Sequence, residues 1–322
     1  MKTGIVARSL LALGLGSAAA LAHAAYPDKP LHLIVPYPPG GNIDATARIV
    51  ANGLSAELGQ TVVIENRAGA SGMLGAEVVA RSAPDGYTML LASSGALAPV
   101  KAINPSMKLD PDKDFAAAGS IARAPLMLVV GPSVPSRNVK EFIAYAKARP
   151  GKLTMASAGT GGNGHLTGEL FQSMSGTRFL HVPYKGGGQA MADLIGGQTD
   201  LTFVQPASAL SQMASGKLRA LGVTTLKRSS VVPDVPTLDE SGLPGFEAST
   251  TTGLLFPAGT PKDVLGKVNA ALVKVLKMPD TRKQFEQLGS DVMEGSEDFS
   301  RIVSLEITQW SKVIRDADLK MP

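Results

Sequence analysis

The sequence, with 322 residues, 44% apolar and 18% charged side chains, has the composition of a globular protein long enough for two domains. A formal net charge of +4 does not suggest a nucleic-acid partner. The absence of cysteine excludes disulfides, thiolate metal sites, a cysteine nucleophile and lipid attachment through cysteine.

The first 24 residues have the features of a signal peptide. Lys2 and Arg8 supply positive charge, and residues 10–21 form an apolar stretch that is too short to span a membrane. Small residues then precede the Ala24-Ala25 bond, near which we expect cleavage. The sequence therefore predicts an exported protein.

The next segment predicts a strand, a loop and a helix in succession. Residues 31–35 form an apolar strand, and the prolines and glycines of residues 36–41 interrupt it. Helical spacing of apolar residues follows from Ile43 to Leu54. Gly40 and Gly41 leave room for a ligand close to the backbone, and the helix N-terminus favours negative charge. We interpret this loop as an anion-binding site, with an ordinary βα turn as the alternative.

Apolar strand patterns alternate with helical patterns through most of the chain, which predicts an α/β fold with parallel sheets. Ligands of such sheets bind at the carboxyl ends of the strands. We expect two lobes, residues 25–124 plus 248–322 and residues 125–247, joined by crossing strands near Leu126 and Thr250. A helix is predicted over residues 136–148, and helices at residues 262–276, 280–288 and 299–314 complete the chain.

A second glycine-rich loop, residues 157–165, also follows a strand and opens a helix. Gly159, Gly161 and Gly164 satisfy the dinucleotide-binding pattern G-x-G-x-x-G. No acidic residue follows about 20 residues later, so we reject a dinucleotide site. The tripeptide Gly-Gly-Asn occurs in this loop and in the first one, which predicts one anion-binding loop in each lobe.

Three side chains in or beside glycine-rich loops have both a structural and a functional interpretation. Asp44 lies in the first turn of its helix, where complementing the helix dipole or holding the loop is the favoured role. His165 either holds the second loop or donates to a ligand, and Lys185 either contacts a ligand or is a solvated loop residue. We assign Trp310 to packing, and no Walker loop, G-x-S-x-G or H-E-x-x-H motif occurs.

Several long stretches resemble the Bug-type substrate-binding proteins, the extracytoplasmic receptors of tripartite tricarboxylate transporters. The matching sequences are YPDKPLHLIVPYPPGGNID, ENRAGASGMLGAEVVARSAPDGYTML, SAGTGGNGHLTGELF, HVPYKGGGQAMADLIGGQTDL, GKLRALGVT, and VPDVPTLDESGLPGFEAST through FPAGTP. The resemblance covers nearly all of the mature chain. It implies a type II periplasmic-binding-protein fold, a periplasmic location and a small organic mono- or dicarboxylate ligand held mainly by backbone amides, hydroxyls and waters.

The loops and the resemblance together predict the ligand-binding residues. They are Tyr37, Pro38, Gly40, Gly41, Asp44, Ser93, Ser94, Ser157, Ala158, Gly159, Thr160, Gly161, His165, Tyr184, Lys185, Gly186 and Gln205. Many family members carry Asp at the position of Val204. Because Val204 offers no partner to a buried ammonium group and Gln205 only a neutral amide, we expect a ligand without an amino group.

The resulting hypothesis is a monomeric receptor, not an enzyme, that delivers a carboxylate to membrane permease subunits. It needs no cofactor and no metal. Two alternatives stay open at this point. One is a secreted hydrolase that uses His165 with a nearby serine and Asp44, and the other is a sensor that presents its ligand to a histidine kinase.

Overall fold

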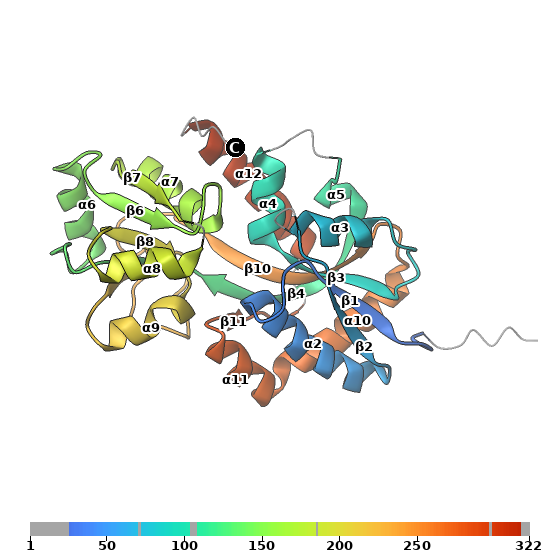
Figure 1. The fold of residues 1–322 in the computed structure, drawn as a ribbon. Helices are drawn as coiled ribbons and strands as arrows, with labels where there is room; N and C mark the ends of the chain where they lie inside the picture. Colours follow the sequence, from blue (N-terminus) through green and yellow to red (C-terminus); the bar gives the residue numbers. More distant parts are fainter. Residues whose placement is uncertain (1–25, 70–71, 104–107, 185, 296–297, 317–322) are drawn as a thin grey trace, which may run out of the picture.

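The computed structural model describes residues 26–69, 72–103, 108–184, 186–295 and 298–316, so the predicted signal peptide lies outside the described residues. Two β-sheets form the centres of two lobes, and Figure 1 shows two long strands passing between the lobes. The two-lobe α/β fold expected from the sequence is confirmed.

The first lobe has a sheet in which β1, β2 and β3 are parallel and β10 runs antiparallel to β3 and β4. The order of its strands is β11 (Asp291–Val292), β4 (Phe115–Pro125), β10 (Ser249–Pro257), β3 (Thr88–Ser93), β1 (Leu31–Val35) and β2 (Val62–Asn66). The helices around it are α2 (Asn42–Leu58), α3 (Met73–Ala80), α4 (Ser94–Ile103), α5 (Pro111–Asp114), α10 (Lys262–Lys277), α11 (Pro279–Gln287) and α12 (Phe299–Asp316).

The second lobe has a sheet in which β6 is parallel to β7 and β8, while β5 runs antiparallel to β8 and β9. The order of its strands is β7 (Leu180–Pro183), β6 (Thr154–Ser157), β8 (Leu201–Val204), β5 (Met127–Val130) and β9 (Arg219–Val223). Its helices are α6 (Val139–Lys147), α7 (Asn163–Ser175), α8 (Gly187–Ile195) and α9 (Pro206–Ala214).

Both sheets are mixed, whereas the alternation of strands and helices predicts parallel ones. The chain leaves the first lobe along β4, enters the second as β5 and returns as β10. Each strand that arrives from the other lobe runs against the parallel strands of the lobe it enters. The carboxyl ends of β1 and β3 therefore face the carboxyl ends of β6 and β8 across the space between the lobes. Ligand-binding loops collect at such ends.

Side chains that alternate along the strands fill a core on each face of each sheet. In β1, Leu33 and Val35 pack with apolar residues of α2 and α10, whereas Ile34 packs with residues of α3 and α12. In β5, Leu128 packs toward α6 and α7, while Met127 packs toward α8 and α9. This alternation is the two-residue period of a strand covered on both faces.

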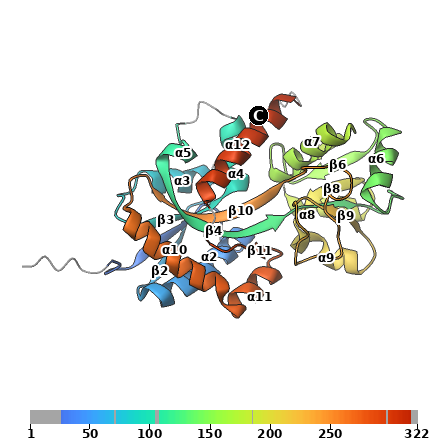
Figure 2. The same cartoon turned by 180° about the vertical axis from the view of Figure 1, so that it is seen from behind.

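Helix α12 belongs to both lobes. Phe299 and Val303, near its start, pack in the core of the first lobe, and Trp310 and Val313, near its end, pack in the core of the second. Figure 2 shows α12 lying obliquely across the crossing strands, with its C-terminal end toward α7. The predicted packing role of Trp310 is confirmed, since the residue is 1% exposed. The lobes are thus joined by a helix as well as by β4 and β10.

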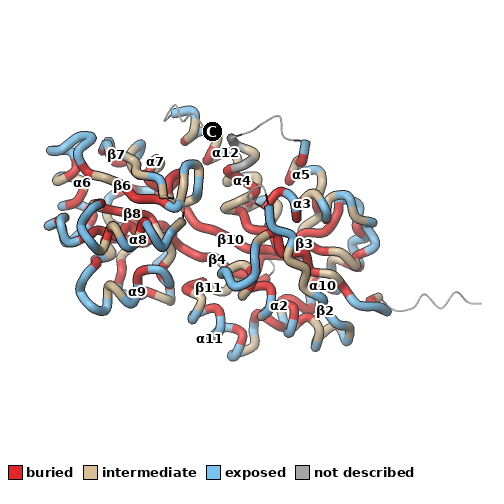
Figure 3. The backbone as a smooth tube through the Cα atoms, in the orientation of Figure 1, coloured by how far each residue is buried: buried red, intermediate tan, exposed pale blue. Residues whose placement is uncertain are grey.

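Several predicted elements are present, and four were missed, namely α4, α5, β4 and β11. In α6, the Asn138 side chain accepts a hydrogen bond from the Glu141 N–H at 2.9 Å, as the predicted cap requires. The sequence analysis predicts neither α4 nor the full length of β4. Every residue of β10 is buried, as Figure 3 shows for the strand between the lobes. The predicted lobe boundaries stay a prediction.

Candidate functional site

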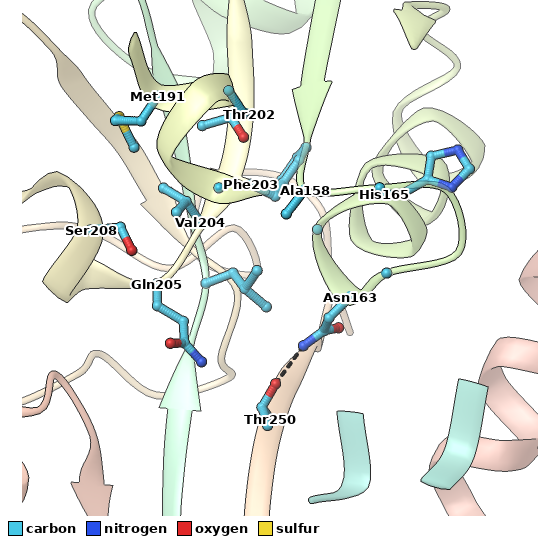
Figure 4. Close-up of a pocket in the computed structure, with 16 residues that line it drawn as sticks. Ala158, Asn163, His165, Met191, Thr202, Phe203, Val204, Gln205, Ser208 and Thr250 are labelled. Atoms are coloured by element: carbon cyan, nitrogen blue, oxygen red, sulfur yellow. Dashed lines mark hydrogen bonds between the residues drawn. The ribbon is translucent and has the colours of Figure 1, made fainter. Parts of the chain in front are cut away.

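A cavity of about 280 Å³ lies at the carboxyl ends of β6 and β8 (Figure 4). Most of its wall comes from the second lobe, and Leu126 and Thr250 add the region where the chain crosses between lobes. Its polar lining residues include Asn163, Thr202 and Gln205. None of the described residues that line it is Asp, Glu, Lys or Arg. A ligand charge here is therefore met by backbone groups and neutral side chains.

Three helices begin at this cavity. The residues that precede α7, α8 and α9 are Gly162, Gly186 and Gln205. The two glycines have no capping side chain, and the Gln205 side chain does not cap α9. Residues from all three helix starts line the cavity. The first N–H groups of a helix have no partner within the helix and carry the positive end of its dipole. Because α9 begins with Pro206, which has no N–H, α7 and α8 are the stronger donors to an anion.

The glycines at the start of α8 leave space that the protein does not fill. A Cβ atom built on Gly186, Gly187 or Gly188 would meet no heavy atom within 4 Å. None of the three adopts the left-handed conformation that favours glycine. Neither backbone strain nor packing within the described chain requires glycine there. Glycine there leaves the backbone open to close approach by another molecule.

His165 holds the second glycine-rich loop. Its Nδ1 accepts a hydrogen bond from the Gly161 N–H at 3.0 Å, and its Nε2 lies 3.4 Å from Glu169 Oε1. An accepting Nδ1 leaves the imidazole proton on Nε2, which faces the carboxylate. The ring stacks on His181, with centroids 3.7 Å apart. His165 also borders the cavity, so the structural interpretation and the ligand-donor interpretation both remain compatible with its position.

A serine of this lobe lies within hydrogen-bond distance of a histidine, which is His181. Ser157 Oγ is 2.7 Å from His181 Nε2 and also donates to the Gly159 carbonyl at 3.0 Å. Burial, with a smaller effect from His165, lowers the pKa of His181 to about 4. A histidine with so low a pKa is a weak general base at neutral pH. These contacts favour a structural role for Ser157 and His181 over a catalytic one.

Asp44 is committed to the first glycine-rich loop. Its carboxylate accepts hydrogen bonds from Gly40 N–H at 3.0 Å, Arg48 Nε at 2.9 Å and Asn66 Nδ2 at 3.0 Å. The side chain is buried, which by itself raises the pKa. The donors outweigh this and lower the pKa to about 2. These contacts agree with the favoured interpretation that Asp44 holds the loop.

The predicted ligand-binding residues divide into two groups. The cavity brings together Ala158, Gly159, His165 and Gln205. The others that the structure describes do not line it. These are Tyr37, Pro38, Gly40, Gly41, Asp44, Ser93, Ser94, Ser157, Thr160, Gly161, Tyr184 and Gly186, and Lys185 lies outside the described residues. The roles of all seventeen in ligand binding stay a prediction.

Two hydroxyls that were expected to reach the ligand have partners within the protein. Tyr184 donates to Asp193 Oδ2 at 2.6 Å. Ser94 is fully buried, donates to Glu306 Oε1 at 2.9 Å and accepts from the Thr251 N–H at 3.0 Å. Burial raises the pKa of Tyr37 to about 12, so this phenol stays neutral.

Sequence reasoning missed several residues of the cavity wall. The polar ones are Asn163, Thr202, Ser208 and Thr250, and the apolar ones include Met191 and Phe203. Asn163 Nδ2 donates to Thr250 Oγ1 at 2.5 Å and so connects α7 to the crossing strand (Figure 4). The repeated Gly-Gly-Asn tripeptide contains a signal for Asn163. No local signal identifies Thr250, because it lies 87 residues farther along the chain.

Within the residues that the structure describes, no group of three or more His, Asp or Glu side chains is placed to hold a metal ion. None of the helices described is both long and apolar enough to cross a membrane.

Comparisons with known proteins agree with this geometry. Residues 46–319 match the family model described as the tripartite tricarboxylate transporter family receptor. The protein BugT of Bordetella pertussis is 36% identical over 308 residues, which cover 95% of this chain and 94% of BugT.

Solved structures with more than 30% sequence identity share the fold. The periplasmic binding protein BugD has a TM-score of 0.72 at 35% identity and covers 92% of this chain and 99% of its own. An R. palustris protein, Rpa4515, with adipate has a TM-score of 0.76 at 34% identity, covering 91% and 98%. The Rhodopseudomonas palustris protein MatC with bound malate has a TM-score of 0.73 at 33% identity, covering 90% and 100%. The match to the family model and the identity to BugT show that the chain belongs to the tripartite tricarboxylate transporter receptor family.

Proposed function

We propose that this periplasmic protein captures a small organic carboxylate in the cavity at the carboxyl ends of β6 and β8 and delivers it to membrane permease subunits. The observation that carries the proposal is the convergence of α7 and α8, without side-chain caps, on a cavity whose described lining contains no Asp, Glu, Lys or Arg. Helix N-termini bind carboxylates through their free N–H groups. The family supports a transport role, because its members serve tripartite tricarboxylate transporters.

The ligand that suits this cavity is a mono- or dicarboxylate without an amino group. Val204, Phe203 and Met191 give part of the wall an apolar surface. An ammonium group buried there would lack a carboxylate partner, and an unpaired buried charge costs several kcal/mol. The nearest acid along the strand, Asp200, accepts from Thr154 N–H at 2.8 Å and from Ser133 Oγ at 2.8 Å. These contacts hold it at the start of β8, away from the cavity.

The ligands of related proteins support the same chemical class. Adipate is a dicarboxylate of a plain aliphatic chain, and malate is a hydroxy-dicarboxylate, and neither carries an amino group. Gln205, beside the apolar wall, offers an amide that can orient a hydroxyl or a second carboxylate. A sensor that presents the ligand to a histidine kinase would use the same cavity, so the binding site alone favours neither role.

Thermal unfolding with a panel of mono-, di- and tricarboxylates tests the proposal. A ligand that binds only the folded state stabilises it by about 2.7 kcal/mol at a hundredfold excess over Kd, which raises Tm by several degrees. Calorimetry should then show aspartate binding at least about tenfold more weakly than succinate, or than whichever deaminated analogue binds. A flat response to carboxylates beside a clear response to sugars would refute the proposal. Tighter binding of aspartate would refute only the selectivity.

A further inference from the structure

A carboxylate lies at the middle of the helix that joins the lobes. Glu306 is between Val303, in the core of the first lobe, and Trp310, in the core of the second. Its Oε1 accepts from Ser94 Oγ at 2.9 Å, and Ser94 in turn accepts from the N–H of Thr251 in β10. One chain of hydrogen bonds thus connects α12, the start of α4 and a crossing strand.

The Glu306 carboxylate also borders a second, smaller cavity of about 110 Å³, lined by residues of β4, α12 and the start of β10. These three elements join the lobes and form the hinge. Glu306 Oε2, Trp310 Nε1 and Arg123 Nε are all buried, and none has a hydrogen-bond partner among the described residues. A buried polar atom without a partner costs free energy, more so when it is charged. Burial of the charge disfavours the ionised form of Glu306 and outweighs the nearby Ser94 and Trp310 donors, which favour it.

The charges around Glu306 are few and lie on different elements. From β4, Arg123 attracts the ionised form, but its NH1 is already 3.1 Å from Glu247 Oε1. Glu247, just before β10, repels it, while α4 and β10 present the uncharged groups of Ser94 and Thr251. The described lining of the cavity contains no further charged side chain. Burial is the largest effect on the pKa of Glu306 and raises it to about 7.

We propose that Glu306 is a proton-binding site in the hinge, and that release of its proton shifts the arrangement of the two lobes. Movement of the lobes displaces α12 relative to at least one of the two cores it joins. An ionised Glu306 favours arrangements in which its carboxylate is more exposed to water, whereas the protonated form keeps the Ser94 contact in its buried position. Proton uptake thereby stabilises the arrangement described above.

Trp310 allows this site to be observed directly, because it is the single tryptophan of the 322-residue chain. It lines the same cavity as Glu306, one helical turn away. We expect the emission of the ligand-free wild type to change between pH 5.5 and 8.5 with a midpoint near 7, where Glu306 titrates. Glu306→Gln should remove that transition, and Glu286→Gln, which removes an exposed carboxylate of α11, should keep it. A transition that persists in Glu306→Gln would overturn the proposal.

The lobe movement needs a separate readout. Since the chain has no cysteine, dyes can be attached through Lys152→Cys in the second lobe and Lys262→Cys in the first, both exposed positions. Energy transfer between the dyes should change over the same pH range in the wild-type background and not with Glu306→Gln. Constant transfer over this range would overturn the coupling to the lobes even if the emission of Trp310 changes with pH.

Should Glu306→Gln fail to fold, Ser94→Ala is the second variant. Loss of the Ser94 donor should move the midpoint of the Trp310 emission change to higher pH. An unmoved midpoint would count against the proposal. No ligand is present in these experiments, so their outcome is separate from that of the carboxylate screen.

Discussion

Asp44 is a buried carboxylate whose contacts lie within the protein, at the glycine-rich loop before α2. Its oxygens are occupied by Gly40, Arg48 and Asn66, so the side chain fixes the loop that precedes α2. Hydrogen bonds to a charged group contribute more than those between neutral groups, about 1.5–3 kcal/mol each. The loop conformation therefore depends on the ionised form of this residue.

Asp44→Asn should lower the free energy of unfolding by about 1.5–3 kcal/mol at pH 7. Because the pKa of Asp44 is lowered from 3.8 to about 2, its contribution is present above about pH 4 and is lost as the pH falls through 2. Denaturant unfolding at pH 7 and at pH 2.5 should thus show a smaller difference between wild type and variant at the acidic pH. The control is Asp263→Asn, which changes an exposed acid in the first turn of α10. A difference that grows toward acidic pH would contradict this role for Asp44.

At the scale of elements, the glycine-rich starts of α2 and α7 could be predicted because a local pattern encodes them. Gly40 and Gly161 each have a positive φ, and a helix begins within two residues of each. The beginning of α4 has no such signal, since Ser93 and Ser94 pass directly from strand to helix and Pro99 lies inside the helix. Chain-local propensity argues against this helix, and packing on α12 overrides it.

Strand β4 was missed for a different reason. Its sequence, FAAAGSIARAP, is rich in alanine and lacks a clear two-residue alternation. Its structure follows from pairing with β10 along nearly its whole length, and β10 lies more than 120 residues away.

Part of the cavity wall could not be predicted for the same reason, since it depends on contacts between distant segments. Asn163 and Gln205 lie beside local motifs, whereas Thr250 reaches the site only through the tertiary fold.

Helix α8 provides a test that separates ligand binding from stability. Gly187 lines the cavity, is not left-handed and has free space where a Cβ would be. Gly187→Ala should leave the free energy of unfolding unchanged or raise it by about 0.4–1 kcal/mol. It should weaken carboxylate binding, because the methyl group enters the space from which an anion would contact the helix start.

The matched control is Gly266→Ala in α10, where a Cβ also meets nothing within 4 Å. This change should stabilise the helix by about 0.5–1 kcal/mol and leave the carboxylate Kd unchanged. Denaturant unfolding and calorimetry on both variants give the comparison. Equal ligand affinity in Gly187→Ala and wild type would show that α8 is not part of the binding site.

On the scale of the whole molecule, the cavity is lined on one side only. The second lobe and the crossing region form it, and the loop of residues 36–41 in the first lobe does not line it. The helix that follows this loop nevertheless contacts the segment after α11, since Asn42 Nδ2 donates to the Leu288 carbonyl at 3.1 Å. A Cβ at the adjacent Gly289 would lie 3.1 Å from the backbone of Ala207, at the start of α9. The first lobe thus already touches the second beside the cavity.

Closure of the lobes on a ligand would bring the start of α2 to the anion as well. Gly41 precedes α2 without capping it, and a Cβ there would meet no heavy atom within 4 Å. Gly41→Ala should therefore fold with nearly wild-type stability but weaken binding of the carboxylate that the panel identifies, although Gly41 does not line the cavity. Small-angle scattering should show a smaller radius of gyration with that carboxylate present, in wild type more than in the variant. The ligand gains contacts only in the closed arrangement, and this differential affinity drives the change. An unchanged radius together with unchanged affinity in Gly41→Ala would show that the second lobe binds the ligand alone and that no clamp exists.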